Sequence, residues 1–403
     1  MGSLIHHTFK VSICAIIALL ALVARAQQRN DSIVVLPDSS NFVTASVLVT
    51  SPGKDFYSIL GHSAIRLQCP SKRLDYCFSY ESNYHAGAYL LFILGQTKAG
   101  FYAVPTDRYL NDYRQEGRGI TEYTLNLTHH EKQELWRSLD NHVMKGLCEP
   151  FDFIFHNCTS MLFIQIQSIM QSEDFRYPRP MVLSKGNRPY VTSMYGESPW
   201  MDFLYIALLS AYTHQEIATD NLLCPPLMAT LLESATIEGL DGSNRPALAG
   251  KPSTLVKQKL KVSHSPLTPI KVFSLLLAFC ILLSIIECWR GRKKWISMTD
   301  TILFAIYTFY SLILVYVSVI KLFGISWNWM LVVFNPLPFL LWLLCRKKPW
   351  YRQIWLIYAI VISTFMVFLP CYTGQMEIPH LLLLGSMMIR CISKYKSYNT
   401  KLS

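Results

Sequence analysis

Residues 59–80 read ILGHSAIRLQCPSKRLDYCFSY, two alternating stretches separated by a turn. Apolar and polar residues alternate along Ile59–Leu67 and again along Leu74–Tyr80, which is the period of a strand with one buried face. Between them, Pro70–Arg73 supplies a proline and polar residues typical of a turn. The stretch therefore predicts an antiparallel β-hairpin, with His62 near the start of its first strand.

Further strands and helices are predicted on both sides of this hairpin. Asn41–Thr50 (NFVTASVLVT) is rich in valine and threonine and predicts a strand. Thr128, with Glu131 three residues later, predicts a capped helix that runs to about Met144. A second helix is expected to begin near Cys158, with a core side made of Met161, Leu162, Ile164, Ile166 and Ile169. This part of the chain thus predicts an α+β domain.

The last third of the chain is strongly apolar. Of the 403 residues 51% are hydrophobic, too many for one soluble domain, and the excess begins at about Val272. A membrane core requires about 20 residues of helix. Apolar runs predict an all-α bundle of about five spanning helices, at Ile270–Cys288, Thr301–Ile320, Trp327–Leu344, Ile354–Leu369 and Ile378–Ile392. Glu287, near the end of the first run, is expected to extend its carboxylate to the membrane surface.

Asn335–Pro338 (NPLP) interrupts the third apolar run. Proline removes a helical hydrogen bond, so one interpretation is a broken helix that exposes carbonyl oxygens to a lipid head group or a substrate. The alternative is a kink whose freed carbonyls are satisfied by neighbouring helices, and we favour this second interpretation.

The positive charge lies in the apolar third. Residues 290–403 contain thirteen Lys and Arg against Asp300 and Glu377, which accounts for the net charge of +11. The first 289 residues are therefore formally neutral, which argues against a nucleic-acid-binding domain. Basic clusters at 290–294, 346–352 and 394–401 alternate with loops nearly free of Lys and Arg. Because positive loops stay in the cytoplasm, the chain is expected to enter from outside at Ile270 and to end inside.

The first 26 residues have the pattern of a signal peptide. Lys10 precedes the apolar stretch Val11–Val23, and Ala24–Ala26 (ARA) has the small residues of a cleavage site. A retained signal anchor is the alternative. Either interpretation places residues 27–262 outside the cytoplasm. The expected order is then a linker at 263–269, a membrane domain at 270–392 and a cytoplasmic tail at 393–403.

Asn157 and Cys158 stand where an alternating run meets the start of a helix. A helix N-terminus lowers the pKa of a thiol and can hold an oxyanion, and an imidazole can take the thiol proton. The exported part and its linker contain eight histidines: His62, His85, His129, His130, His142, His156, His214 and His264. These residues alone do not single out one pair, since an exported cysteine is more often half of a disulfide.

The remaining cysteines and histidines do not suggest a metal site. No CxxC or HxxxH spacing occurs, so we expect neither a metal nor a cofactor. One or two disulfides are expected among Cys69, Cys77, Cys148 and Cys224, because an export compartment is oxidising. A turn at Pro70–Arg73 would prevent Cys69 and Cys77 from facing each other across the hairpin.

Gly61–Arg66 (GHSAIR) resembles the signature of the Lnb family, the lipoprotein N-acylation transferases of Bacteroidota. Further segments match the family pattern in order, namely Asp75–Tyr80, Gly95–Tyr102, Tyr113–Arg118, Leu125–Thr128, Phe151–Cys158, Pro199-Trp200 and Pro225-Pro226. With the membrane tail and its NPLP interruption, the resemblance covers nearly the whole mature chain.

The resemblance implies an exported domain with a circularly permuted papain-like (NlpC-type) fold, in which the histidine precedes the cysteine. It implies His62 as the base and Cys158 as the nucleophile. Either Asp75 or Glu81 is expected to orient His62, and we favour Asp75.

Two further residues are candidates for substrate binding. Arg66 is expected either to recognise a phosphate or to form a surface salt bridge. Asn157 is expected either to support the site or only to cap the helix.

The resemblance also implies an activity. A lipoprotein N-acyltransferase of the bacterial inner membrane, with its catalytic domain in the periplasm, would use a phospholipid donor and diacylated lipoproteins as partners. A cell-wall cysteine peptidase or amidase on the same fold is the alternative enzyme, and a scaffold with a disulfide-bonded Cys158 is a non-enzymatic one. Because soluble wall fragments do not require a membrane bundle, we favour the acyltransferase. Its site should open toward the membrane, with Tyr89–Phe92 and Trp200–Leu208 as candidate walls.

The charge pattern makes a direct prediction about topology. A reporter enzyme that is active only in the periplasm should be inactive when fused after Ser403 and active when fused within residues 27–262. Activity of the C-terminal fusion would mean an even number of spans, and the run at Ile378–Ile392 would then not cross the membrane.

Overall fold

The computed structural model describes residues 44–54, 58–82, 88–153, 155–170, 174–176, 199–209, 224–239, 241–260, 266–320, 328–345, 350–373 and 377–399. The predicted signal peptide, the first part of the predicted linker, and His85, His214 and His264 lie outside these ranges.

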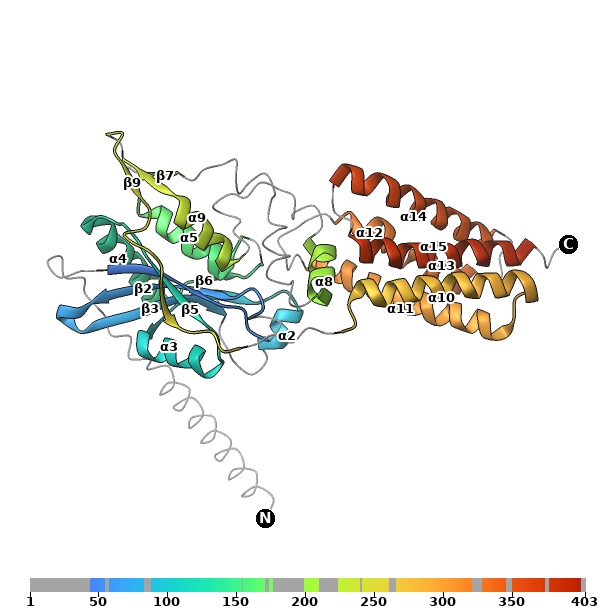
Figure 1. Cartoon of the computed structure of the whole chain (residues 1–403), viewed down its shortest axis with the longest axis horizontal. Helices are drawn as coiled ribbons and strands as arrows, with labels where there is room; N and C mark the ends of the chain where they lie inside the picture. The colour runs from blue at the N-terminus through green and yellow to red at the C-terminus, as the bar shows by residue number, and fades with distance from the viewer. Residues whose placement is uncertain are drawn as a thin grey trace, which may run out of the picture.

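A seven-stranded antiparallel sheet forms the N-terminal domain (Figure 1). Its order is β10-β5-β1-β2-β3-β4-β6. The predicted hairpin is confirmed, since Cys69 of β2 pairs with Leu74 of β3 around a left-handed Arg73. The strands are β1 (Thr44–Thr50), β2 (His62–Cys69), β3 (Leu74–Ser82), β4 (Lys98–Pro105), β5 (Ile120–Thr124), β6 (Cys148–Pro150) and β10 (Ser253–Val256).

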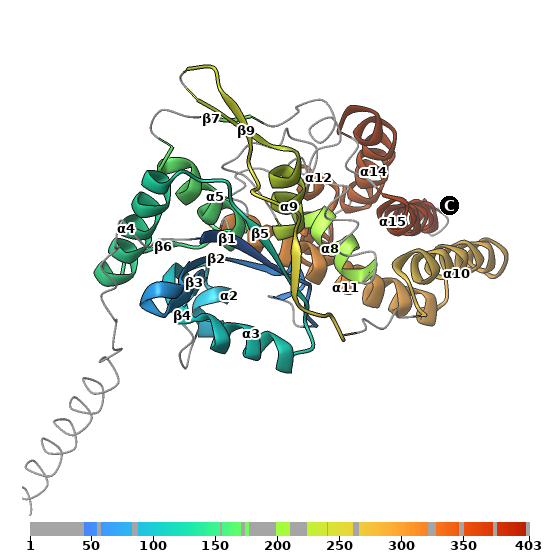
Figure 2. The same cartoon turned by 60° about the vertical axis from the view of Figure 1, so that its left-hand side comes forward.

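Helices cover both faces of this sheet, so the domain is α+β (Figures 1 and 2). One face, with Leu48, Ala64 and Cys77, packs against α3 (Thr106–Gln115). The opposite face packs against α4 (His129–Lys145), α5 (Cys158–Ser168) and α9 (Pro225–Ser234). A three-stranded sheet is formed by β7 (Asp174–Arg176), β8 (Thr236–Glu238) and β9 (Asn244–Pro246).

The two predicted helix starts are confirmed. Thr128 and Glu131 form both bonds of a capping box at the start of α4, and α5 begins at Cys158. The predicted core side of α5 is wrong at one position. Leu162 and Ile166 are buried, but Ile164 is 37% exposed. Two residues correspond to about 200° around a helix, so Ile164 cannot share the face of its neighbours.

The C-terminal part is a helical bundle, in which α15 packs between α10 and α14. Two of the described helices, α10 and α11, are long and apolar enough to cross a membrane, while 330–345 and 353–368 are shorter apolar stretches. The last helix extends to Asn399, beyond the predicted boundary at 392. The helices are α10 (Pro269–Arg290), α11 (Lys294–Val319), α12 (Met330–Val333), α13 (Leu337–Cys345), α14 (Tyr351–Thr373) and α15 (Ile378–Asn399).

The NPLP motif separates α12 from α13. Asn335 bridges the break, because its side chain donates to Val332 O and accepts from Leu337 N. The carbonyl of Val333 accepts hydrogen bonds from the hydroxyls of Tyr307 and Tyr358 on α11 and α14. The helix is therefore broken and not merely kinked, but neighbouring helices satisfy the carbonyl of Val333, as the favoured interpretation expected.

The sheet domain lies directly on one end of the bundle. Helix α8 (Pro199–Leu209) provides Tyr205, which shares an apolar cluster with Phe153 of the sheet domain and Phe304 of α11. Asn328, ahead of α12, donates to Ala207 O at 2.8 Å. The two parts of the chain thus share one apolar core.

Four charged residues, three of them buried, tie α10, α11 and α15 together. Arg390 of α15 bonds Asp300 Oδ1 at 2.7 Å and Glu287 Oε2 at 2.8 Å, and Arg292 bonds the second oxygen of each acid. The expectation that Glu287 reaches the membrane surface is wrong, because two guanidinium groups hold its carboxylate inside the bundle. Two acids and two bases in alternating contact leave no uncompensated charge.

Removing one member of this network should destabilise the bundle. Arg390→Met should lower the free energy of unfolding by roughly 3–5 kcal/mol, because Asp300 and Glu287 would each lose a buried partner. The midpoint of thermal unfolding in detergent measures this, with Arg290→Met, an exposed arginine at the end of α10, as the control. Equal midpoints for the two variants would contradict the structural role of the network.

Candidate functional site

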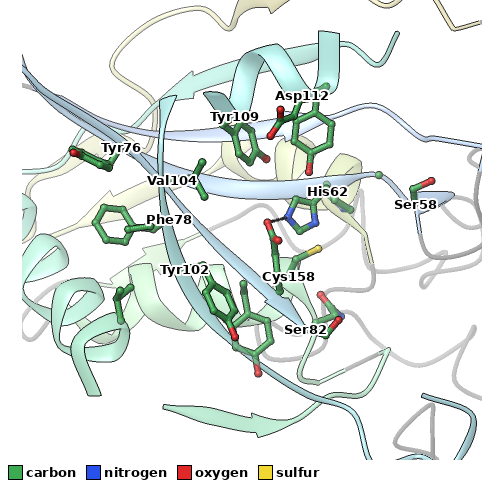
Figure 3. A pocket seen from close by; sticks show the side chains of 18 of the residues that line it. Ser58, His62, Tyr76, Phe78, Ser82, Tyr102, Val104, Tyr109, Asp112 and Cys158 are labelled. Carbon is green, nitrogen blue, oxygen red and sulfur yellow. Dashed lines mark ion pairs between the residues drawn. The ribbon is translucent and has the colours of Figure 1, made fainter. Parts of the chain in front are cut away.

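His62 and Cys158 meet at one end of strand β2, as Figure 3 shows. Ser63, the residue after His62, points to the opposite face of the sheet, where its hydroxyl donates to Cys158 O at 3.1 Å. The backbone N–H of Ser63 also bonds the thiol of Cys158. Ser63 of β2 therefore holds the start of α5 beside the imidazole of His62.

Gly61 is required by the backbone ahead of His62. Its φ is +87°, and a Cβ there would lie 2.6 Å from the carbonyl oxygen of Thr50. Any other residue would be strained and would push β2 away from β1. This accounts for the glycine in the Gly-His pair.

The Nε2 atom of His62 faces two residues of β3. It lies 2.6 Å from Ser79 Oγ and 3.5 Å from Glu81 Oε1. Because Nε2 has these partners, Nδ1 is the ring nitrogen left for the thiol of Cys158. The ring of Tyr113, from α3, stacks on the imidazole with 6.3 Å between the ring centroids.

These surroundings change the pKa of His62. Burial by itself lowers the pKa, but Tyr113, the thiolate of Cys158 and the carboxylate of Glu81 outweigh it and raise the pKa well above its ordinary value. For Glu81 burial acts to raise the pKa, and the bond and charge of His62 lower it below the usual range. His62 and Glu81 thus form an ion pair in which each partner favours the charged form of the other.

The thiol of Cys158 is shifted in the direction that a nucleophile requires. Burial by itself raises its pKa, but the charge and hydrogen bond of His62, the N–H of Ser63 and the hydroxyl of Thr159 lower it below the ordinary value. The lowered thiol pKa and the raised imidazole pKa both favour a thiolate–imidazolium pair.

Asp75 does not contact His62, so the favoured orienting residue is wrong. Its carboxylate accepts from Arg66 Nε at 2.8 Å and from Thr106 Oγ1 at 2.5 Å. Asp75 and Glu81 share one face of β3 but lie six residues apart, about 20 Å along a strand. Asp75 pairs with Gln68, toward the turn end of the hairpin, whereas His62 lies at its other end.

Arg66 forms a salt bridge, as in its structural interpretation, whereas Asn157 caps the helix and also lines the cavity beside Cys158. Arg66 is held by Asp75 and also donates to Glu122 Oε1 at 3.0 Å, so its guanidinium has two carboxylate partners. Asn157 caps α5, because its Oδ1 accepts from the N–H groups of Thr159 and Ser160. The cap thus engages the N–H groups of Thr159 and Ser160 and not that of Cys158.

Sequence reasoning assigned no role to Ser79, Tyr113 or Arg118. Ser79 and Glu81 lie two residues apart on one strand, so the alternation of side chains would have placed both on the same face. Tyr113 and Arg118 belong to a segment that matches the family pattern, but nothing in the sequence linked them to His62. In the structure the guanidinium of Arg118 lies 4.7 Å above the Tyr113 ring, and its Nε donates to Ser51 O.

The described cysteines other than Cys158 are also free thiols, and Cys224 lies near enough to Cys158 for their charges to interact. His156, two residues before Cys158, bonds Asp152 Oδ2 at 2.6 Å. No disulfide joins the described cysteines, which contradicts the expected one or two. Cys69 and Cys77 are out of register, as predicted, because Cys77 pairs with Arg66. Among the described residues no group of three or more His, Cys, Asp or Glu could hold a metal ion.

The pair lines a cavity of about 710 Å³ (Figure 3). Polar groups of α3, including Asp112 and Tyr113, form one wall. Leu60, Phe151 and Phe153 form an apolar wall, and these three residues also pack in the cluster that contains the bundle residues. One wall of the cavity therefore adjoins the junction with the bundle.

Two family models match the chain. The Lnb N-terminal periplasmic domain matches residues 38–183, and the Lnb transmembrane domain matches residues 261–401. The chain belongs to the Lnb family. It is thus a membrane protein with a periplasmic domain. The searches of curated proteins and of solved structures found no match for this Lnb protein.

The site makes a prediction about pH. Glu81→Gln removes a charge that raises the pKa of His62, so the imidazolium should lose its proton at lower pH and the Cys158 pKa should rise. Alkylation of Cys158 by iodoacetamide, followed by mass spectrometry against pH, should therefore begin at higher pH than in the wild type. Asp75→Asn is the control and should leave this profile in place. A shift with Asp75→Asn but none with Glu81→Gln would restore Asp75 as the orienting residue.

Proposed function

We propose that this Lnb protein is a lipoprotein N-acyltransferase of the bacterial inner membrane, with Cys158 as nucleophile and His62 as acid and base. One observation carries the proposal. The thiolate–imidazolium pair lines a cavity whose apolar wall, at Phe151 and Phe153, packs against the membrane bundle. A histidine on a strand that precedes a cysteine at a helix start also supports a circularly permuted papain-like fold.

The first half-reaction forms a thioester. The Sγ of Cys158 attacks the carbonyl carbon of a phospholipid ester, and the N–H of Cys158 at the start of α5 stabilises the resulting oxyanion. When the C–O bond breaks, His62 gives its proton to the departing alkoxide. The products are a lysophospholipid and an acyl group on Cys158, with a neutral imidazole beside it.

The second half-reaction forms an amide. The α-amine of the N-terminal diacylglyceryl-cysteine of a lipoprotein attacks the thioester carbonyl, and the C–S bond breaks. His62 takes the proton that the amine loses, which regenerates the thiolate–imidazolium pair. Glu81, through its contact with Nε2, keeps the imidazole oriented in both halves.

The position of the cavity matters because of the lipid substrates. Each CH₂ exposed to water costs about 0.8 kcal/mol, so a chain of about fifteen carbons drawn into water would cost on the order of 12 kcal/mol. A cavity that adjoins the bundle spares this cost. A peptidase that acts on soluble wall fragments gains nothing from such a position.

Substitution of the nucleophile tests the proposal. In cells that carry Cys158→Ala, lipoproteins should lack the amide-linked acyl chain, because methyl cannot form an acyl intermediate. Mass spectrometry of N-terminal lipopeptides measures the chain. The control is Cys148→Ala, which removes an exposed thiol of the same domain and should leave acylation intact. Full acylation in the Cys158→Ala strain would refute the nucleophile.

A further inference from the structure

An exposed apolar face occurs on α2 (Ala88–Ile93) and the residue after it. Leu90, Ile93 and Leu94 are 59%, 54% and 45% exposed. Spacings of three and four residues place all three on one side of the helix. A periplasmic domain does not normally leave three neighbouring aliphatic side chains in water.

This face lies at the end of a membrane-spanning helix. The hydroxyl of Tyr316 on α11 donates to Ile93 O. Gly95 packs so closely on Ile320, the residue that ends α11, that a Cβ there would lie 2.9 Å from Ile320 Cβ. Figure 1 accordingly shows α2 at the end of the sheet domain that faces the bundle.

The opposite side of α2 packs against a residue of the cavity wall. The ring of Phe92 packs edge-on against Phe153, with 5.9 Å between the centroids. Phe153 lines the cavity of Cys158, and its ring also packs edge-on against that of Tyr205 of α8, with 6.3 Å between the ring centroids. The short helix therefore contacts both a residue of the cavity wall and the outer end of α11.

We infer that α2 lies in the outer leaflet of the membrane, with Leu90, Ile93 and Leu94 among lipid acyl chains. Phe92 and Phe153 then lie along the path by which an acyl chain reaches Cys158. The membrane contact stands independently, whereas the role in lipid access rests on the proposed acyltransferase function.

Continuity with the bundle identifies the occupant as lipid. Leu312, Tyr316 and Val319 of α11 are exposed and, at spacings of four and three, form one stripe. In a spanning helix such a stripe contacts lipid. Tyr316 joins this stripe to α2 through its bond to Ile93, and no charged residue interrupts Leu90–Leu94. A helix of six residues is also too short to persist without a surface to pack on.

Photolabelling tests the membrane contact in the full chain. The protein would be reconstituted in phosphatidylethanolamine–phosphatidylglycerol vesicles that contain a phospholipid with a diazirine on one acyl chain. After irradiation and trypsin digestion, fragment-ion spectra of peptide 74–98 should place label on residues 90–94. Peptides of α10 and α11 are the positive control, and peptide 119–132, which includes β5, is the negative one. Labelled α11 with unlabelled residues 90–94 would overturn the inference, including the case in which a second protein covers this face.

A double variant tests lipid access. Leu90→Asp with Ile93→Asp should lower N-acylation from vesicle phospholipid by on the order of tenfold or more, because two carboxylates must leave the apolar phase. Transfer from a water-soluble dihexanoyl phospholipid should be unchanged, since the thiolate pair is untouched. The matched control, Leu90→Met with Ile93→Met, should keep both activities.

The outcomes separate the two levels of the proposal. Unchanged vesicle activity in the aspartate variant would overturn lipid access at α2. An equal loss with both donors, or altered alkylation of Cys158, would mean that α2 supports the fold and would overturn it as well. If the wild type transfers no acyl group from either donor, the proposed function fails, and photolabelling still decides the membrane contact.

Discussion

The two hydrogen bonds between Ser63 and Cys158 are the contact on which the site depends. They join a strand to a helix that begins 95 residues later, and they do so one residue away from His62. Since successive residues of a strand point to opposite faces, His62 and Ser63 act on the two sides of the sheet edge. The thiol is carried by the start of a helix and the imidazole by a strand, so neither side chain depends on a loop for its position.

The charges around this contact are divided into two separate groups. Near the turn of the hairpin, Arg66 is neutralised by Asp75 and Glu122, and this group only stabilises the sheet. At the other end, the carboxylate of Glu81 pairs with His62 and also bonds Ser79, so its charge helps to hold the imidazolium.

The cavity of Cys158 lies beside the junction between the sheet domain and the bundle. Phe153 belongs at once to the cavity wall and to the apolar cluster that contains Tyr205 and Phe304. The bundle itself is held together by the ion network around Arg390, which joins α15 to Glu287 of α10 and to Asp300 of α11. The sheet domain and the bundle therefore meet in one apolar cluster beside the cavity, although they are matched by separate family models.

The sequence by itself determined the features that depend on local pattern. These are the hairpin at 59–80, the capped starts of α4 and α5, the apolar helices of the bundle and, through the family resemblance, the pair His62 and Cys158. The tertiary structure alone decided between Asp75 and Glu81 for the contact with His62, and it placed Tyr113 against the imidazole. It also buried Glu287 with its arginines. The physical reason is that caps and periodicity arise from residues a few positions apart, whereas these choices depend on strand register and helix packing between distant segments.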